Sequence, residues 1–244
     1  MKSIGREFME LTKYKYEGES EQEKGTKQPP LELSYDFKGR IIDLPDPSDI
    51  TVKDITLREA IENRHTIRSY TDEKLTLEEL TFLLWCTQGV KDIKVGKATL
   101  RNVPSAGARH AFETYLLINK VEGLKVGLYR YVALENKLIE VEIDQAMAER
   151  VSKACSEQKF IEKSAVTFIW TAVPNRMTWR YSERGYRYMH LDAGHVCQNL
   201  YLAAEAVDCG VCAIASYDDD ELNSLLKINE EEAFAIYVAS LGKK

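Results

Sequence analysis

The sequence lacks the features of several common classes of protein. No apolar run approaches the roughly 20 residues that span a bilayer, and the first residues lack the apolar core of a secretory signal. Positive charge is in short supply, because 33 Lys and Arg oppose 39 Asp and Glu and leave a net charge of -6. Nucleic-acid binding favours a basic surface. We therefore expect a cytoplasmic protein whose partners include neither a membrane nor a nucleic acid.

Several nucleotide-binding and catalytic motifs are also missing. The chain contains no G-x-G-x-x-G, no G-x-x-x-x-G-K-[ST] and no G-x-S-x-G. These absences disfavour a Rossmann dinucleotide loop, a triphosphate-binding loop and a serine nucleophile on a strand-to-helix turn. His190 and His195 are five residues apart, so they do not share one face of a helix. We expect no metal site.

Cysteine is sparse. The five cysteines are an odd number, and we expect reduced thiols. Cys209 and Cys212 form a C-x-x-C, but no second pair of zinc ligands is present at close spacing. The pair follows an apolar-periodic run over 196–207, which places it at a helix C-terminus rather than at the N-terminus that activates thiols. We expect two packed small residues, with a redox or zinc role as the alternative.

The 244 residues divide into two regions of different character. Residues 1–50 are polar and predict an extended arm without a core of its own, with a short helix near 6–13. Residues 51–244 predict one α+β domain, because strands and helices intermix and some strands form hairpin-like pairs. Asp192 is the expected N-cap of the longest helix, and residues 91–102 predict an irregular loop. Predicted strands cover 112–121, 126–132, 137–141, 165–173, 211–215 and 233–241, and predicted helices cover 77–89, 144–157, 192–208 and 218–226.

The five residues from Arg64 to Arg68 carry two guanidiniums, an imidazole and a hydroxyl. Arg64, Thr66 and Arg68 alternate, so an extended backbone directs all three side chains to one face. Two arginine forks and a hydroxyl on one face suit a phosphate group. The alternative is an ordinary basic surface turn.

Three further segments carry possible chemistry. The small residues of 104–107 would let backbone approach a flat ligand closely, and the apolar strand over 211–215 ends in small residues where a backbone N–H could face a redox ring. Each could equally be a loop without a ligand. Over 175–190 arginines and aromatic residues interleave, which can stack nucleic-acid bases. In an acidic chain we expect instead a loop that lines a pocket or an intersubunit surface.

Taken in order, these segments resemble the nitroreductase family of flavoproteins, and most closely its SagB-type azoline dehydrogenase branch. The resemblance covers roughly residues 55–242. It implies a nitroreductase-like fold, with a central, mainly antiparallel sheet flanked by helices, and a homodimer that binds two FMN molecules at the subunit interface. The matching motifs are RHTIRSY at 64–70, WCTQG at 85–89, RNVPSAGA at 101–108, GLYRY at 127–131, GYRY at 185–188 and LDAGHVCQNL at 191–200.

The resemblance also assigns roles to residues. It implies a phosphate and ribityl site on one segment, a loop that approaches the isoalloxazine ring from the other subunit, and a backbone N–H near flavin N5. No side chain is assigned as catalytic, because the flavin carries the redox chemistry itself. The phosphate and ribityl residues are Arg64, His65, Thr66 and Arg68, with Lys243 or Lys244 closing over the phosphate; the ring residues are Pro104, Ser105, Ala106 and Gly107; the N5 residues are Ala215 and Ser216.

The implied activity is hydride transfer between NAD(P)H and a small acceptor, a nitroaromatic or a quinone, by a ping-pong cycle through FMN. Two alternatives stay open. One is a peptide dehydrogenase that oxidises azolines to azoles with oxygen as acceptor, for which Tyr186, Tyr188 and Lys97 are candidate bases. The other is a flavin-binding protein without reductase turnover.

Overall fold

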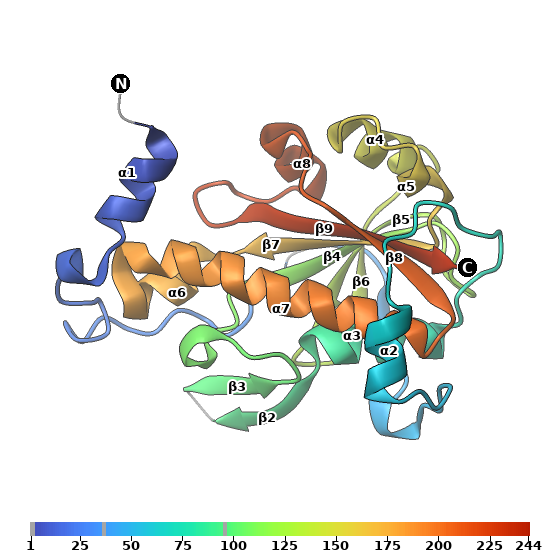
Figure 1. Ribbon diagram of the computed structural model, residues 1–244, viewed down its shortest axis with the longest axis horizontal. Helices are drawn as coiled ribbons and strands as arrows, with labels where there is room; N and C mark the ends of the chain where they lie inside the picture. Colours follow the sequence, from blue (N-terminus) through green and yellow to red (C-terminus); the bar gives the residue numbers. More distant parts are fainter. Residues whose placement is uncertain (1–2, 36–37, 95–96) are drawn as a thin grey trace.

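The computed structural model describes residues 3–35, 38–94 and 97–244 (Figure 1). At its centre is a seven-stranded sheet in the order β1-β6-β5-β4-β7-β9-β8, whose neighbouring strands are all antiparallel. Strands β2 and β3 form a second, two-stranded sheet. The predicted α+β class with a mainly antiparallel sheet is therefore confirmed. The strands are β1 (Ile41–Asp43), β2 (Val90–Lys94), β3 (Ala98–Arg101), β4 (Phe112–Ile118), β5 (Gly127–Val132), β6 (Lys137–Ile143), β7 (Val166–Ala172), β8 (Cys209–Ile214) and β9 (Phe234–Lys243).

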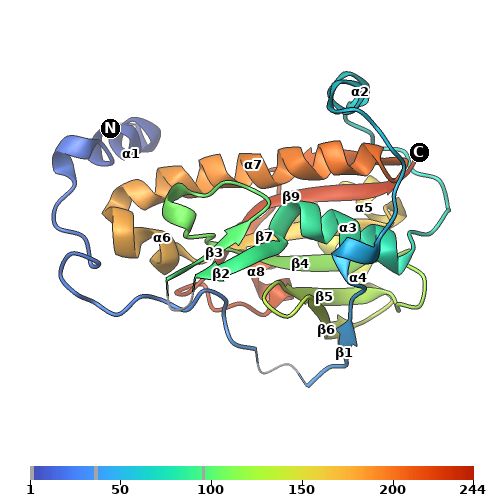
Figure 2. The same cartoon turned by 90° about the horizontal axis from the view of Figure 1, so that it is seen from below.

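Helices cover both faces of the seven-stranded sheet (Figures 1 and 2). Helices α3 and α7 pack on one face and α4, α5 and α8 on the other, so each face has its own apolar core. Helix α7 has 21 residues, which at 1.5 Å per residue is about 31 Å. The helices are α1 (Ile4–Leu11), α2 (Leu57–Asn63), α3 (Leu77–Gln88), α4 (Met147–Ala154), α5 (Phe160–Lys163), α6 (Pro174–Tyr181), α7 (Gly185–Glu205) and α8 (Asp219–Leu226), with 3-10 turns η1 (Tyr14–Tyr16), η2 (Pro47–Asp49), η3 (Ala106–Ala108) and η4 (Ser182–Arg184).

The elements that the sequence predicted best are those with a strong local signal. Thr76 and Glu79 form the capping box that starts α3, with both reciprocal hydrogen bonds present. Strands β4 and β7 are buried along their whole length, as expected for apolar and β-branched runs at the centre of a covered sheet. Across the described ranges, no helix is both long enough and apolar enough to cross a membrane.

Several local predictions are wrong. Asp192 does not cap the long helix, because α7 begins at Gly185 and Asp192 lies two turns inside it. Residues 91–102 are not an irregular loop, since they contain β2 and β3; the charged, exposed residues of β2 hide the alternation of a strand. Cys209 and Cys212 lie within β8 rather than at the end of a helix, and both are buried free thiols.

Residues 175–190 are also not a loop, because they form α6, η4 and the start of α7. Their arginines and aromatic residues hold the N-terminal segment along the outside of the domain. Arg176 donates to the carbonyl of Pro30, Trp179 to that of Thr26 and Arg184 to that of Thr12. Farther along, β1 joins the edge of the main sheet beside β6.

A buried ion cluster anchors this N-terminal segment. The Glu113 carboxylate pairs with Arg130, at 2.9 Å, and with Arg176, and it accepts a 2.8 Å hydrogen bond from the backbone of Leu33. Burial alone would raise the pKa of Glu113, but the two guanidiniums outweigh burial and hold that pKa below its ordinary value. The cluster therefore ties the segment before β1 to the centre of the sheet.

Candidate functional site

The segment that carries Arg64, Thr66 and Arg68 lies against strand β8. Arg64 is the C-cap of α2, and the chain then runs parallel to β8 through a bridge between Thr66 and Val211. The N–H of the next residue, Ile67, donates to the Val211 carbonyl at 3.0 Å. Gly210 permits this contact, because a Cβ there would lie 2.6 Å from the Ile67 side chain.

Tyr201 of α7 supports this segment from behind. Its hydroxyl lies 3.1 Å from the Thr66 hydroxyl and accepts a 3.0 Å hydrogen bond from the backbone of Ala213 on β8. The Arg64 guanidinium sits over its ring, 5.3 Å from the centroid, which is a cation–π distance. Tyr201 is not among the residues predicted from the sequence, where its only signal is a polar-tipped aromatic residue within an apolar run.

The charges of the segment are available to a ligand. Within the described part of the chain, neither Arg64 nor Arg68 forms an ion pair with a carboxylate, and Arg68 and His65 are exposed. The His65 ring faces the carbonyl of Asn63 at 2.7 Å. Two unpaired guanidiniums beside a hydroxyl are the donor set that a phosphate group needs. The residues present therefore fit the phosphate of FMN.

Hydrogen bonds at Ser105 and Ala106 fix the middle of the loop over 104–107. The Ser105 hydroxyl accepts from the His110 backbone at 2.9 Å, and the Ala106 N–H lies 3.3 Å from each carboxylate oxygen of Asp192 on α7. Burial raises the pKa of Asp192, while hydrogen bonds from Ser105 and Ala106 favour its charged form. Pro104 is exposed at the start of the loop. Asp192, expected as a helix cap, is instead the anchor of this loop.

Gly107 has a positive φ of 58°, a backbone conformation that residues other than glycine rarely adopt. A Cβ at this position would also lie 2.4 Å from the hydroxyl of Tyr181. Conformation and space therefore both require glycine here. Tyr181 belongs to the aromatic residues of 175–190, and it lies next to the predicted ring loop.

Ala215 and Ser216 are exposed directly after β8. The Ser216 hydroxyl lies 2.9 Å from the Ser156 hydroxyl, and the Ser216 carbonyl accepts a 3.2 Å hydrogen bond from the Gln158 side chain. The predicted N5 segment is therefore held in place by the turn between α4 and α5.

The amine of Lys243, another predicted site residue, is already paired with a carboxylate. This amine donates to Glu79 at 2.5 Å and to the Val207 carbonyl at 3.0 Å, and the residue is only 8% exposed. Burial lowers the pKa of Lys243, but Glu79 outweighs burial and the pKa is raised. Its assignment to the phosphate stays a prediction, and it requires this ion pair to open.

The structure brings some of these segments together in one chain and not others. The 64–68 segment contacts β8 at Val211, and Ala215 lies four residues farther along, about 13 Å at 3.3 Å per residue. The 104–107 loop contacts α7 at Asp192, nine residues before Tyr201, which is about 13 Å along the helix axis. One chain therefore places the predicted phosphate segment against β8 and the predicted N5 segment just after that strand, while the predicted ring loop contacts α7 two and a half turns before Tyr201.

Comparisons with known proteins agree with this fold. The model of the nitroreductase family matches residues 61–243. MJ1384 of Methanocaldococcus jannaschii, a protein named as a nitroreductase by inference, is 31% identical over 203 residues, which are 83% of this chain and 96% of that protein. The chain belongs to the nitroreductase family.

Two further proteins are similar to this chain, one in sequence and one in fold. The trifolitoxin-processing protein TfxB of Rhizobium leguminosarum is 29% identical over 175 residues, or 68% of this chain, and the match spans about half of TfxB, 47% of its length. A chain of the Escherichia coli microcin synthetase McbBCD complex, with truncated pro-MccB17 bound, superimposes with a TM-score of 0.62 at 18% identity and covers 99% of this chain and 92% of its own. The structural similarity, at 18% identity, shows the fold alone. The sequence similarity to TfxB supports the resemblance to the SagB-type branch.

Proposed function

We propose that this chain is an FMN-dependent oxidoreductase that passes hydride between NAD(P)H and a small acceptor, a nitroaromatic or a quinone, by a ping-pong cycle. The observation that carries the proposal is the 64–68 segment, with two guanidiniums free of carboxylates and a hydroxyl docked against β8. A bound flavin would supply the hydride chemistry, so the chain itself needs no catalytic triad or metal.

The residues of the chain bind and orient in this proposal. Arg64 and Arg68 hold the phosphate by charge-assisted hydrogen bonds, and Tyr201 keeps the Thr66 hydroxyl in place for the ribityl chain. The backbone at Ala215 and Ser216 donates toward the ring. The cationic forks also favour a negatively charged reduced ring by Coulomb attraction.

We also propose a homodimer that completes the site. Helix α7 presents a solvent-facing stripe that includes Leu191, which is 62% exposed, and Gly194, whose Cβ position is open. If two copies of α7 pack antiparallel about a two-fold axis through the middle of this stripe, Asp192 of each copy approaches the C-terminal half of the other helix. That arrangement would bring the 104–107 loop of one subunit toward the phosphate segment of the other.

Ligand-dependent thermal stability tests the proposal directly. The purified protein should show visible flavin absorbance, and added FMN should raise its Tm by mass action, since a ligand at 100 times its Kd adds about 2.7 kcal/mol. Riboflavin, which lacks the phosphate, should raise Tm much less. Steady oxidation of NAD(P)H with a nitroaromatic or quinone should follow. A colourless protein whose Tm does not change when FMN is added would exclude every flavin-dependent function.

A peptide azoline dehydrogenase is the second candidate, and the similarity to TfxB and to the microcin synthetase favours it. Such an enzyme removes a hydride and a proton from adjacent ring carbons, so it needs a base. Of the candidate bases, Tyr188 is engaged by Arg184 at 2.9 Å. Lys97 is exposed. The Arg109 guanidinium donates hydrogen bonds to the carbonyl of Lys97 and to the carbonyl of Gly107, and it thereby connects Lys97 to the ring loop.

Lys97 is therefore the base that we propose for this second reaction. The substitution Lys97→Met should abolish azole formation and leave NAD(P)H oxidation with a quinone unchanged. Equal loss of both activities would instead indicate a general role in flavin binding.

A further inference from the structure

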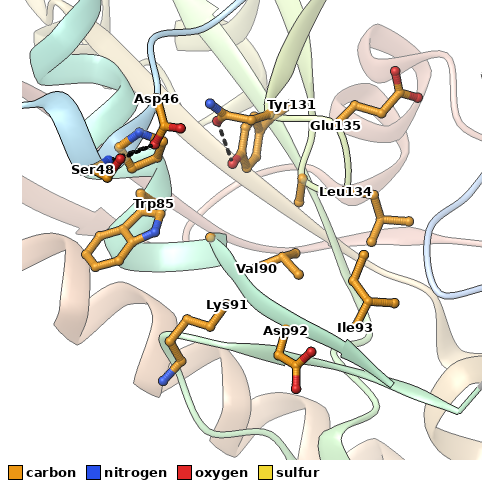
Figure 3. A pocket seen from close by; sticks show the side chains of 14 residues that line it. Asp46, Ser48, Trp85, Val90, Lys91, Asp92, Ile93, Tyr131, Leu134 and Glu135 are labelled. Carbon is orange, nitrogen blue, oxygen red and sulfur yellow. Dashed lines mark hydrogen bonds between the residues drawn. The ribbon is translucent and has the colours of Figure 1, made fainter. Parts of the chain in front are cut away.

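A cleft of about 810 Å³ opens beside strand β2, and none of the residues predicted to hold the flavin lines it (Figure 3). Its other walls are the region around η2 and the turn that joins β5 to β6. A volume of this size lies within the range of sites that hold small molecules or peptide side chains. Its lining differs from that of the site already described, so it calls for a separate occupant.

One wall of the cleft is formed by consecutive residues of a single segment. The five consecutive residues from Gly89 to Ile93 all line it. Among the described strands, β2 pairs with β3 alone, so its second edge has no strand partner. An unpaired edge presents N–H and C=O groups to an added strand, and a two-stranded sheet gains stability from a third strand. The cleft therefore suits an extended chain.

The side chains around the cleft specify which extended chain fits. Val90 and Ile93 of β2 and Leu134 of the facing turn surround the open space (Figure 3). Ile93 is 47% exposed, so it has apolar surface left to bury. Three carboxylates and one ammonium group belong to the lining, from Asp46, Asp92, Glu135 and Lys91. Two of the carboxylates are already paired, Asp92 with Lys94 and Glu135 with Lys137 at 3.2 Å. The wall is therefore close to neutral, which favours an uncharged occupant.

The position of β2 connects this cleft to the flavin loop. Strand β3 ends at Arg101, three residues before Pro104, and the side chain of Asn102 fixes the connection by donating to the Trp85 carbonyl at 2.7 Å. A chain held along β2 is therefore attached to the same ribbon that continues into the 104–107 loop.

We propose that an extended peptide segment, uncharged where it contacts the cleft and apolar at alternate positions, binds in this cleft as a third strand on the free edge of β2. This inference rests on the second candidate function, because it gives the peptide substrate of that reaction a docking site apart from the flavin. The backbone of β2 supplies affinity and the apolar wall supplies side-chain preference, as in other cases of strand addition.

A synthetic nine-residue peptide of alternating valine and serine, with a lysine at each end, tests the proposal. Binding to the full-length protein is measured by calorimetry and by tryptophan fluorescence, since Trp85 lines the cleft. Two N-methylated versions, one methylated at the valines and one at the serines, remove the donors of opposite strand edges. One version should bind as the parent does and the other at least tenfold more weakly. Equal affinity of all three peptides, or no binding at all, would overturn the proposal.

A matched pair of variants locates the site. Ile93→Ser should weaken peptide binding about tenfold or more. Leu100→Ser should leave binding unchanged, because Leu100 does not line the cleft. Leu100 is a matched control, since it is an apolar residue of the same two-stranded sheet and is 39% exposed. Equal losses in the two variants would count against the cleft. Self-association that Ile93→Ser alone abolishes would identify a second copy as the occupant and overturn the proposal.

Flavin absorbance and quinone reduction, measured on the same samples, distinguish a failure of the docking site from a failure of the oxidoreductase proposal. If the peptide does not bind but flavin activity persists, the docking site fails and the oxidoreductase proposal stands. If the peptide binds to a protein that never binds flavin, the docking site stands and the proposed function fails.

Discussion

Asp192 and Ala106 are joined across two elements, with the Ala106 N–H 3.3 Å from each carboxylate oxygen of the aspartate. The carboxylate belongs to the middle of α7, and the N–H belongs to the loop proposed to approach the flavin ring. A charged acceptor buried beneath a loop is a strong positional constraint, because hydrogen bonds to charged groups contribute about 1.5–3 kcal/mol.

We therefore expect Asp192→Ala to loosen this loop without unfolding the protein. The Ala106 amide should exchange with solvent at least about tenfold faster, and kcat/KM for hydride transfer should fall. Hydrogen exchange followed by mass spectrometry gives the first readout and steady-state kinetics the second. Asp220→Ala, on the exposed face of α8, is the control. Unchanged exchange at Ala106 would show that the aspartate does not hold the loop.

Arg64→Ala should weaken FMN binding by about tenfold or more, because a charge-assisted bond to phosphate is lost. Riboflavin affinity should stay the same, since riboflavin has no phosphate for Arg64 to contact. Arg58→Ala, on the same helix and paired with Glu62 at 2.9 Å, should change neither affinity. Fluorescence titration of the unbound protein measures both ligands. If Arg64→Ala binds FMN as tightly as the parent, the phosphate assignment is wrong.

Gly107→Ala should destabilise the protein by about 1–3 kcal/mol, because an alanine there is strained and meets the Tyr181 hydroxyl. Adding Tyr181→Phe should recover part of the loss by removing the hydroxyl, while the backbone strain persists. Gly18→Ala has no atom within 4 Å of the new Cβ and serves as the control. Urea unfolding measures all four proteins. A double variant no more stable than Gly107→Ala would argue against the steric contact.

Glu113→Gln should lower the free energy of unfolding at pH 7 by about 3–5 kcal/mol, because Arg130 and Arg176 are left as buried, unpaired charges. The parent should also depend on pH in a way that this variant does not. Since the folded pKa of Glu113 lies below the ordinary value near 4.5, its contribution is complete above that value and is lost as the pH falls through the folded pKa. Denaturant melts at neutral pH and below pH 4.5 measure both effects.

Glu62→Gln removes an exposed partner of Arg58 and is the control for that comparison; it should change stability by less than about 1 kcal/mol. A similar pH dependence in the parent and in Glu113→Gln would assign the acid sensitivity to other carboxylates.

The sequence predicted the elements whose signal is local. The capping box at Thr76 and Glu79 and the apolar runs of β4 and β7 are readable because burial and capping leave a pattern in neighbouring residues. The start of α7 was missed because its first two turns place few residues in the apolar core, Met189 among them, and interrupt them with polar residues such as Arg187, which contacts the N-terminal segment. Strand β2 was missed because its exposed residues carry no alternation.

The candidate site divides in the same way. Arg64, Thr66 and Arg68 could be singled out because their chemistry is visible in five consecutive residues. Asp192 and Tyr201 could not, because their roles depend on contacts with residues 86 and 135 positions away in the chain. Periodicity indicates that a residue lies on a helix but does not reveal which loop the helix meets.

The strand order has a consequence for how the protein is made. Strand β9 lies between β7 and β8, so the last strand of the sheet to be synthesised occupies an interior position. Chains emerge from the ribosome N-terminus first. Strand β8 has no sheet neighbour until β9 has been released, and the segment from Arg64 to Arg68 rests on β8. The segment from Arg64 to Arg68, although translated early, can reach its final position only after the residues of β9 have left the ribosome.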